Sequence, residues 1–211
     1  MDINRKIAPK RYDFKSVENI SSDQLQQHYK LYIGYINKFN EINSESRNAS
    51  DYPDSNPTYS KMRCLKLGES YALDGVKLHE LYFENLTNHS CCASKELMAL
   101  INRDFINYDN FIEYFKNAAL AMRGWVILTI DPLTDSLLVI GCDAHDVGAI
   151  WNSYPLLVLD VYEHAYMIDF GIDRKAYINA FIKNINWNVV NKRLQQYLNM
   201  KNSQMQMRKY Q

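Results

Sequence analysis

The chain has 211 residues, 47% of them hydrophobic and 23% charged, and its 24 basic residues balance its 24 acidic ones. This length allows one large domain or two small ones with a sizeable core. A net charge of zero gives no basic excess for binding nucleic acid, and no apolar run approaches the ~18 residues that span a bilayer. We therefore expect neither a nucleic-acid-binding protein nor a membrane protein.

The start of the chain and its cysteines favour a cytoplasmic location. The basic segment MDINRKIAPKRYDF is not followed by the apolar stretch of a signal peptide, and we expect residues 1–17 to form an extended leader. The chain has no C-x-x-C spacing, and four thiols in a chain of this length are typical of free, intracellular cysteines. These thiols are Cys64, Cys91, Cys92 and Cys142.

Two long helices are predicted in the N-terminal half. Ser21-Ser22-Asp23 offers helix N-caps, and apolar residues then recur at close to helical period to about residue 43. Residues 43–60 are polar, contain two prolines and predict a surface loop. A second helix is expected over about 60–87, with breaks near Gly68 and Gly75. The two helices would pack as an antiparallel hairpin.

The second half mixes helices with short strands. Helices are predicted over 96–105, 107–122 and 173–198, and the final residues 199–211 are polar and expected to fray. β-rich runs over 124–131 and 136–143 are joined by PLTD, a hairpin signal, and a third strand is expected over 156–162.

These elements predict an α+β fold in two domains. An N-terminal α-helical hairpin would occupy residues 1–92. A C-terminal domain over 93–211 would hold a three-stranded antiparallel sheet flanked by helices.

Charged residues at the end of the third strand raise a chemical question. In LLVLDVYEHAYMIDFG, residues 156–171, Asp160 and His164 lie four apart within apolar surroundings. A carboxylate in such surroundings needs compensation for its lost hydration. A bound divalent or trivalent cation would supply it, and a buried Asp–His ion pair without metal is the alternative.

Two further histidines lie on the two long helices. If the hairpin packs face to face, His28 and His79 can reach the same point as Asp160 and His164. Three imidazoles and one carboxylate suit iron, manganese or zinc. Each of these histidines, taken alone, is equally compatible with an ordinary core position.

Four segments together resemble the iron/manganese superoxide dismutase family. LDVYEHAYMIDFG resembles the family's C-terminal signature D-V-W-E-H-A-Y-Y, and LINRDFINYDNFIEYFKNAA with GWVILTID resembles its middle segment. LHELYFENL looks like the second-helix motif N-H-x-F-Y-W, and QHYKLYIGYINKFN looks like the first-helix motif H-Y-G-K-H-H-Q-T-Y-V-N-N-L-N. The resemblance covers roughly residues 20–195.

The resemblance implies an antioxidant oxidoreductase that converts superoxide to dioxygen and hydrogen peroxide. It implies one manganese or iron ion per chain, because the reaction needs a metal that changes oxidation state and zinc does not. Carried over position by position, the metal ligands are the following four residues: His28, His79, Asp160 and His164. His89, in NHSCC, would then be a surface or linker residue.

The resemblance also assigns residues around the metal. Tyr35 matches the family's tyrosine at the substrate gateway, and His145 falls where manganese-type members carry a glutamine. Gly75 occupies the alternative, iron-type glutamine position, which favours manganese over iron. Trp125 and Trp151 would form part of an apolar wall around the site.

Glu163 is expected to act across a subunit interface. In the family, this glutamate pairs with the ligand histidine of the other subunit, so Glu163 would orient the partner's copy of His164 in a homodimer or tetramer. Tyr166 would pack nearby.

Several departures from the family motifs leave an alternative open. The first motif is one residue short between His28 and Tyr35, and Leu31-Tyr32-Ile33-Gly34 replaces its usual second histidine pair. Met167 stands where the family commonly has a tyrosine. A dismutase homologue that binds metal but has little activity, with a storage or structural role, is therefore the second hypothesis.

Overall fold

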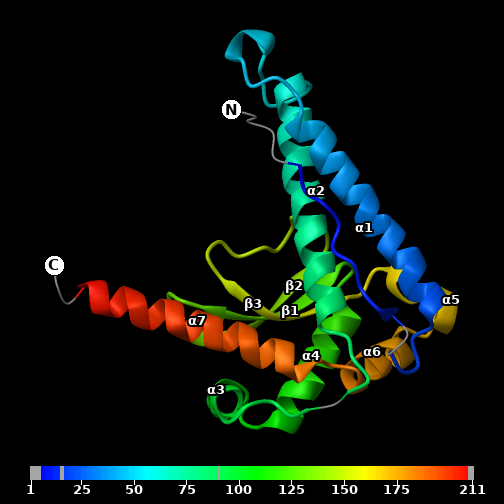
Figure 1. Cartoon of the computed structure of the whole chain (residues 1–211), viewed down its shortest axis with the longest axis vertical. Coiled ribbons are helices and arrows are strands. Elements are labelled where there is room, and N and C mark those ends of the chain that lie inside the picture. Colours follow the sequence, from blue (N-terminus) through cyan, green and yellow to red (C-terminus); the bar gives the residue numbers. More distant parts are fainter. Residues whose placement is uncertain (1–5, 15–16, 90, 209–211) are drawn as a thin grey trace.

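The computed structural model describes residues 6–14, 17–89 and 91–208. A helical hairpin stands on a sheet that is flanked by further helices (Figure 1). This arrangement confirms the predicted α+β class, with an N-terminal helical part and a C-terminal three-stranded antiparallel sheet.

The hairpin consists of α1 (Ser22–Asn43) and α2 (Lys61–Glu84), which pack along each other. Ser21 caps α1 by accepting a hydrogen bond from the Gln24 amide, and Ser60 caps α2 in the same way. The breaks predicted in α2 near Gly68 and Gly75 are wrong, because the helix is continuous. A short 3-10 turn, η2 (Ala49–Asp51), lies in the loop at the tip of the hairpin.

The sheet has the strand order β2-β1-β3, and both pairs are antiparallel. Its strands are β1 (Trp125–Asp131), β2 (Ser136–Cys142) and β3 (Tyr154–Asp160). Trp125, the first residue of β1, pairs with Asp160, the last residue of β3. The acidic end of β3 therefore lies beside the start of the central strand.

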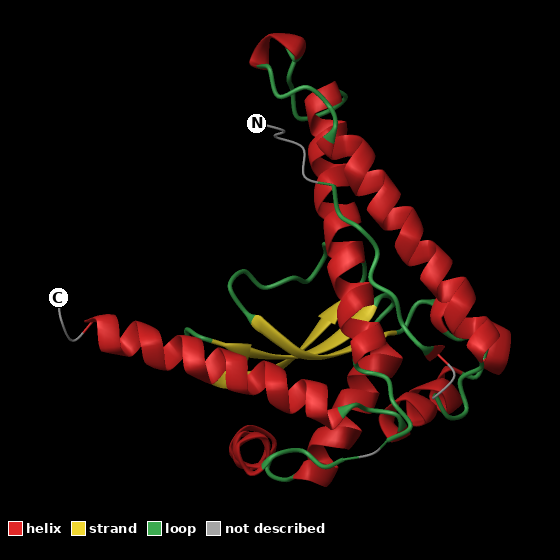
Figure 2. Ribbon diagram, viewed as in Figure 1, coloured by secondary structure: helices red, strands yellow, loops and turns green. Residues whose placement is uncertain are grey.

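Helices cover the sheet and connect it to the hairpin (Figure 2). α2 and α7 pack against β3, while α3 and α4 pack against β2 and β1. Two short elements follow β3 and lead into the last helices. The remaining bounds are α3 (Lys95–Phe105), α4 (Tyr108–Ala121), η3 (Glu163–Ala165), α5 (Met167–Phe170), α6 (Arg174–Lys183) and α7 (Trp187–Arg208).

The last helical segment differs from its prediction in two ways. The single helix expected over 173–198 is two helices, separated at Asn184–Asn186, where Ile185 forms an isolated bridge with Leu86. The expected frayed tail is also wrong in part, because α7 continues to Arg208.

Buried apolar side chains from both halves of the chain form one cluster. Ile36 and Tyr82 of the hairpin belong to it together with Leu157 of β3 and Phe181 of α6. The domain boundary near residue 92 remains a prediction. Across the described residues, no helix combines the length and apolar character needed to cross a membrane.

An extended segment before α1, residues 6–14, lies against both helices of the hairpin (Figure 1). The Ile7 amide donates to Asn40 of α1, and the Lys10 amide donates to the Tyr32 hydroxyl. The Lys10 ammonium lies 2.7 Å from Glu80 and 2.9 Å from Glu84 of α2. We call this segment the N-terminal strap, because it joins α1 to α2.

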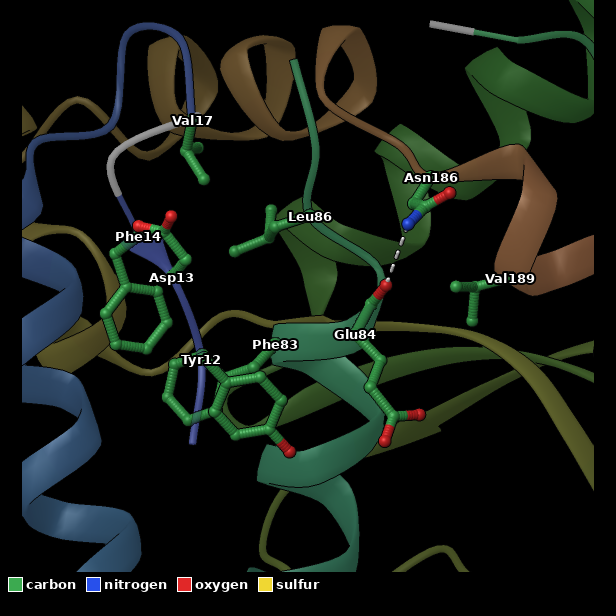
Figure 3. A pocket seen from close by; sticks show the side chains of 9 residues that line it. All are labelled: Tyr12, Asp13, Phe14, Val17, Phe83, Glu84, Leu86, Asn186 and Val189. Carbon is green, nitrogen blue, oxygen red and sulfur yellow. Dashed lines mark hydrogen bonds between the residues drawn. The ribbon is translucent and has the colours of Figure 1, made fainter. Parts of the chain in front are cut away.

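A pocket of about 290 Å³ lies between the strap, the end of α2 and the start of α7 (Figure 3). Tyr12 and Phe14 of the strap and Phe83 of α2 form its aromatic side. The Phe83 ring centroid lies 5.1 Å from that of Tyr12 and 5.1 Å from that of His28. Phe83 therefore separates this pocket from the histidines of the interior.

Arg193 joins α7 to α2 and β3 through a buried polar network. Its side chain is buried and donates to the Asn85 side chain, the Leu156 carbonyl and the Leu81 carbonyl. It also donates to the Glu84 carboxylate at 2.8 Å. Removing the guanidinium of such a network takes a hydrogen bond from several buried or half-buried acceptors at once.

We predict that Arg193→Ala lowers the free energy of unfolding by about 3 kcal/mol or more, because it removes the donor of the Leu81 and Leu156 carbonyls and one of the two cations paired with Glu84. Urea unfolding followed by circular dichroism measures this change. Lys192→Ala is the matched control, since Lys192 is an exposed cation on the same helix and its loss should stay within about 0.5 kcal/mol. Equal effects of the two substitutions would contradict the network's role.

Candidate metal centre

Four separate elements place one potential ligand each at the same point. His28 comes from α1, His79 from α2, Asp160 from the end of β3 and His164 from η3. One ligand atom from each residue lies within 4.8 Å of the others. His28, His79 and Asp160 are fully buried, and the His164 side chain is 26% exposed. The structure thus brings together all four predicted ligands.

The Asp160 carboxylate lies at the middle of the cluster. Its Oδ2 lies 3.0 Å from Nε2 of His28, 3.2 Å from Nε2 of His164 and 3.8 Å from Nε2 of His79. Its other oxygen, Oδ1, accepts a hydrogen bond from the Tyr162 amide at 2.9 Å. This backbone contact fixes the carboxylate so that Oδ2 faces the three imidazoles.

The hydrogen bond of His79 shows that this cluster is suited to a cation. Nδ1 of His79 lies 2.6 Å from the Gly75 carbonyl oxygen, which can only accept, so Nδ1 carries the proton. Nε2 therefore presents a lone pair, and it is buried with no hydrogen-bond partner. A lone pair that faces a carboxylate in a buried site is stabilised by a metal ion between them.

The electrostatics of three members of the cluster, His28, His79 and Asp160, favour the forms that bind metal. Burial lowers the pKa of His28 and of His79, which keeps both imidazoles neutral. Burial alone would raise the pKa of Asp160, but His164 and His28 hold it well below its ordinary value. Burial also acts to lower the pKa of His164, and the Asp160 carboxylate raises it overall. An ionised carboxylate and neutral imidazoles are the forms that coordinate a cation.

Two buried polar residues position this cluster, and neither was predicted. Gln24, one helical turn before His28, donates to the His164 carbonyl at 2.7 Å and accepts from the Ile168 amide at 3.0 Å. Tyr177 of α6 donates to the Asp160 carbonyl at 2.8 Å. The sequence carried one weak signal for Gln24, a polar side chain in the same helical row as His28.

His145 lies beside the cluster and is held by Trp125. The indole N–H of Trp125 donates to Nδ1 of His145 at 2.9 Å, so the imidazole proton is on Nε2. Burial lowers the pKa of His145 to about 4, so the ring is neutral at physiological pH. Nε2 is buried without a hydrogen-bond partner. The Trp125 ring meets the His79 ring edge-on, 5.0 Å between centroids.

Tyr35 lies against both His79 and His145. The Tyr35 ring centroid lies 5.2 Å from that of His79 and 4.6 Å from that of His145. A Cβ atom at Gly75 would lie 3.0 Å from the Tyr35 ring. A side chain at position 75 would therefore crowd the Tyr35 ring, and His145 is the polar side chain on this side of the cluster.

The other predicted residues lie farther out. Tyr166 is buried and stacks on Tyr177, while Glu163 is exposed. Trp151 is 96% exposed in the loop before β3, so the expectation that it lines the site is wrong for this chain. Its loop leaves the end of β2 and carries the ring into solvent. His89 is exposed, as expected of a linker histidine.

The residues that depart from the family motifs have different surroundings. Tyr32 is fully buried, and its hydroxyl donates to Glu80 at 2.8 Å and accepts from the Lys10 amide. Leu31 and Met167 are 42% and 46% exposed. Tyr32 thus helps to hold the N-terminal strap against α1, whereas Leu31 and Met167 lie at the surface.

Comparisons with known proteins agree with this geometry. Residues 93–193 match the family model described as iron/manganese superoxide dismutases, C-terminal domain. The chain is 42% identical to "Superoxide dismutase [Fe]" of Aquifex pyrophilus, over 86% of this chain and 87% of that protein.

Two further relatives extend the comparison. "Superoxide dismutase [Fe]" of Aquifex aeolicus is 41% identical, over 90% of this chain and 92% of that protein. "Superoxide dismutase [Mn]" of Haloarcula marismortui is 32% identical, over 87% of this chain and 90% of that protein.

We predict that His79→Gln weakens metal binding by at least about 100-fold, since losing even a residue that only orients a ligand costs 10–100-fold. Elemental analysis after dialysis against a weak chelator measures the bound metal. His89→Gln is the matched control, because His89 lies five residues beyond α2 and is exposed. Equal metal loss in both variants would remove His79 from the ligand set.

Proposed function

Because this chain belongs to the iron/manganese superoxide dismutase family, we propose that it converts superoxide to dioxygen and hydrogen peroxide. The observation that carries this proposal is the convergence of three imidazoles on Oδ2 of Asp160. The ligands would be the four residues of this cluster: His28, His79, Asp160 and His164.

A bound iron or manganese ion supplies the one-electron cycle between +2 and +3 that this reaction needs. We propose one such ion per chain. The preference for manganese, drawn from His145 and Gly75, lacks support from the relatives, because those at 41–42% identity are named iron enzymes. Relatives at 30–33% identity are named manganese enzymes. These identities favour iron as the working ion.

The residues around the ligands control their surroundings. Trp125 fixes the tautomer of His145, which leaves the Nε2–H of His145 as a donor toward the side of the cluster that Tyr35 covers. Tyr35 would serve as the gateway, because its ring contacts His79 and is only partly buried. The buried Trp125 ring packs against His79 and excludes water from that contact.

A second copy of the chain would complete the site at His164. This side chain is the one ligand that solvent reaches, and exposed Glu163 stands next to it. Leu31, Met167 and Ile168 add exposed apolar surface in the same region. Burial of such surface between two copies would favour association, with Glu163 pairing with the partner's copy of His164.

We propose a cytoplasmic location on the basis of the cysteines, which are free in the structure. Free thiols persist in reducing compartments.

We predict about one iron or manganese ion per purified chain, with fast superoxide turnover per bound ion. Elemental analysis and a turnover assay on the same sample measure both quantities. Chain loaded with zinc should bind the ion and show no turnover, because zinc does not change oxidation state. Full iron or manganese occupancy without turnover would instead support the second hypothesis, a metal-binding homologue with a storage or structural role.

We also predict that Glu163→Ala lowers the stability of the oligomer, since the partner's imidazole would lose its carboxylate. Light scattering across a dilution series should show dissociation at roughly tenfold higher protein concentration than in the unaltered protein. Glu113→Ala, at an exposed glutamate on α4, is the control. An unchanged dissociation profile would remove Glu163 from the interface.

A further inference from the structure

Tyr71 of α2 lies at the mouth of the metal site, although no sequence motif pointed to it. Its ring centroid lies 4.5 Å from that of His145 and 6.1 Å from that of Tyr35. Its side chain is 39% exposed, so it stands between solvent and the two residues beneath it. Tyr71 is therefore among the first side chains that an entering anion meets.

The hydrogen-bonding capacity of His145 limits what it can offer to Tyr35. A neutral imidazole has one donor and one acceptor, and Nδ1 of His145 already accepts from Trp125. A single N–H remains on Nε2. This N–H can donate a hydrogen bond either toward the metal side of the site or to the Tyr35 hydroxyl, but not to both at once.

The Tyr71 side chain is placed to supply that partner. Burial raises the pKa of Tyr35, and the charge and hydrogen-bonding interaction of the neighbouring Tyr71 hydroxyl raise it further. The same two effects of Tyr71 act on Tyr162, which stands two residues beyond Asp160. The Tyr162 hydroxyl donates to the Asp143 carbonyl at 3.3 Å. Tyr71 of α2 thus stands beside Tyr35 of α1 and Tyr162 of the turn after β3.

We propose that Tyr71 is a positioning residue for the dismutase reaction: its hydroxyl holds the Tyr35 hydroxyl in place at the mouth of the site. The ring of Tyr71 packs against the His145 ring at a tilt. The Tyr71 hydroxyl then gives the Tyr35 hydroxyl a hydrogen-bond partner while the single N–H of His145 faces the metal side. Small anions then reach the metal past a Tyr35 of fixed orientation. This inference rests on the proposed function of the same site.

A double-mutant cycle on azide affinity tests the inference. Azide is a small anion that binds open metal positions, and optical titration of the iron-loaded protein measures its dissociation constant without turnover. The four proteins are the unaltered chain, Tyr71→Phe, Tyr35→Phe and the double variant. We expect Tyr71→Phe to change the dissociation constant about threefold or more alone, and less than about 1.5-fold when Tyr35→Phe is already present.

Equal effects of Tyr71→Phe in both backgrounds would overturn the inference, because Tyr71 would then act independently of Tyr35. No effect in either background would overturn it as well. Tyr114→Phe, at a tyrosine of α4 that is 53% exposed, should leave the dissociation constant unchanged. The substitution keeps each ring, so the metal content of all variants should match that of the unaltered chain.

The result is separable from that of the proposed function. A chain that binds iron and azide and shows the coupling, yet turns over no superoxide, would refute the dismutase activity and leave the role of Tyr71 intact. An active chain without the coupling would refute the role of Tyr71 alone.

Discussion

One buried carboxylate, that of Asp160, constrains how the helices and the sheet are arranged. Asp160 is fully inside the protein, where an unpaired charge is costly, and its Oδ2 is met by three imidazole nitrogens. Satisfying it requires α1, α2 and η3 to arrive at the end of β3 together. These elements meet because of the hairpin, the register of β1 with β3 and the turn after β3. The Gln24 side chain then binds the His164 carbonyl, and the Tyr177 hydroxyl binds the Asp160 carbonyl.

A second layer, made mainly of aromatic residues, surrounds this centre and differs from one side to the other. On the side of the strap, Phe83 separates His28 from the pocket of Figure 3, so this side is closed by apolar packing. On the opposite side, Tyr35 and Tyr71 carry hydroxyl groups and are partly exposed. The site is thus closed by apolar packing at Phe83 and bordered by partly exposed, hydroxyl-bearing rings at Tyr35 and Tyr71.

The sequence predicted the parts of this structure that local pattern determines. Sequence periodicity predicted the bounds of α1 and of the three strands to within one or two residues. It also placed His28 and His79 on the two long helices. The sequence pattern did not predict features that depend on contacts between distant residues. Glycine predicts an interruption of α2, but the helix is continuous and Gly75 is buried where a Cβ atom would crowd the Tyr35 ring. The break before α7 depends on the bridge between Ile185 and Leu86, which lie far apart in the sequence. Tyr71 and Gln24 belong to no motif, and their roles are visible only through their neighbours in space.

The origin of the four ligands in separate elements has a consequence for the life of the chain. In the unfolded chain, His28 and His164 are on average far apart, because they lie 136 positions apart in the sequence. The unfolded chain therefore binds the ion much more weakly than the native state, which offers four donors. Binding to the native state alone raises its stability by mass action, in proportion to the logarithm of the free ion concentration. The cellular supply of metal would therefore set how long each molecule survives proteolysis, and chains made during metal shortage would be degraded sooner than loaded ones.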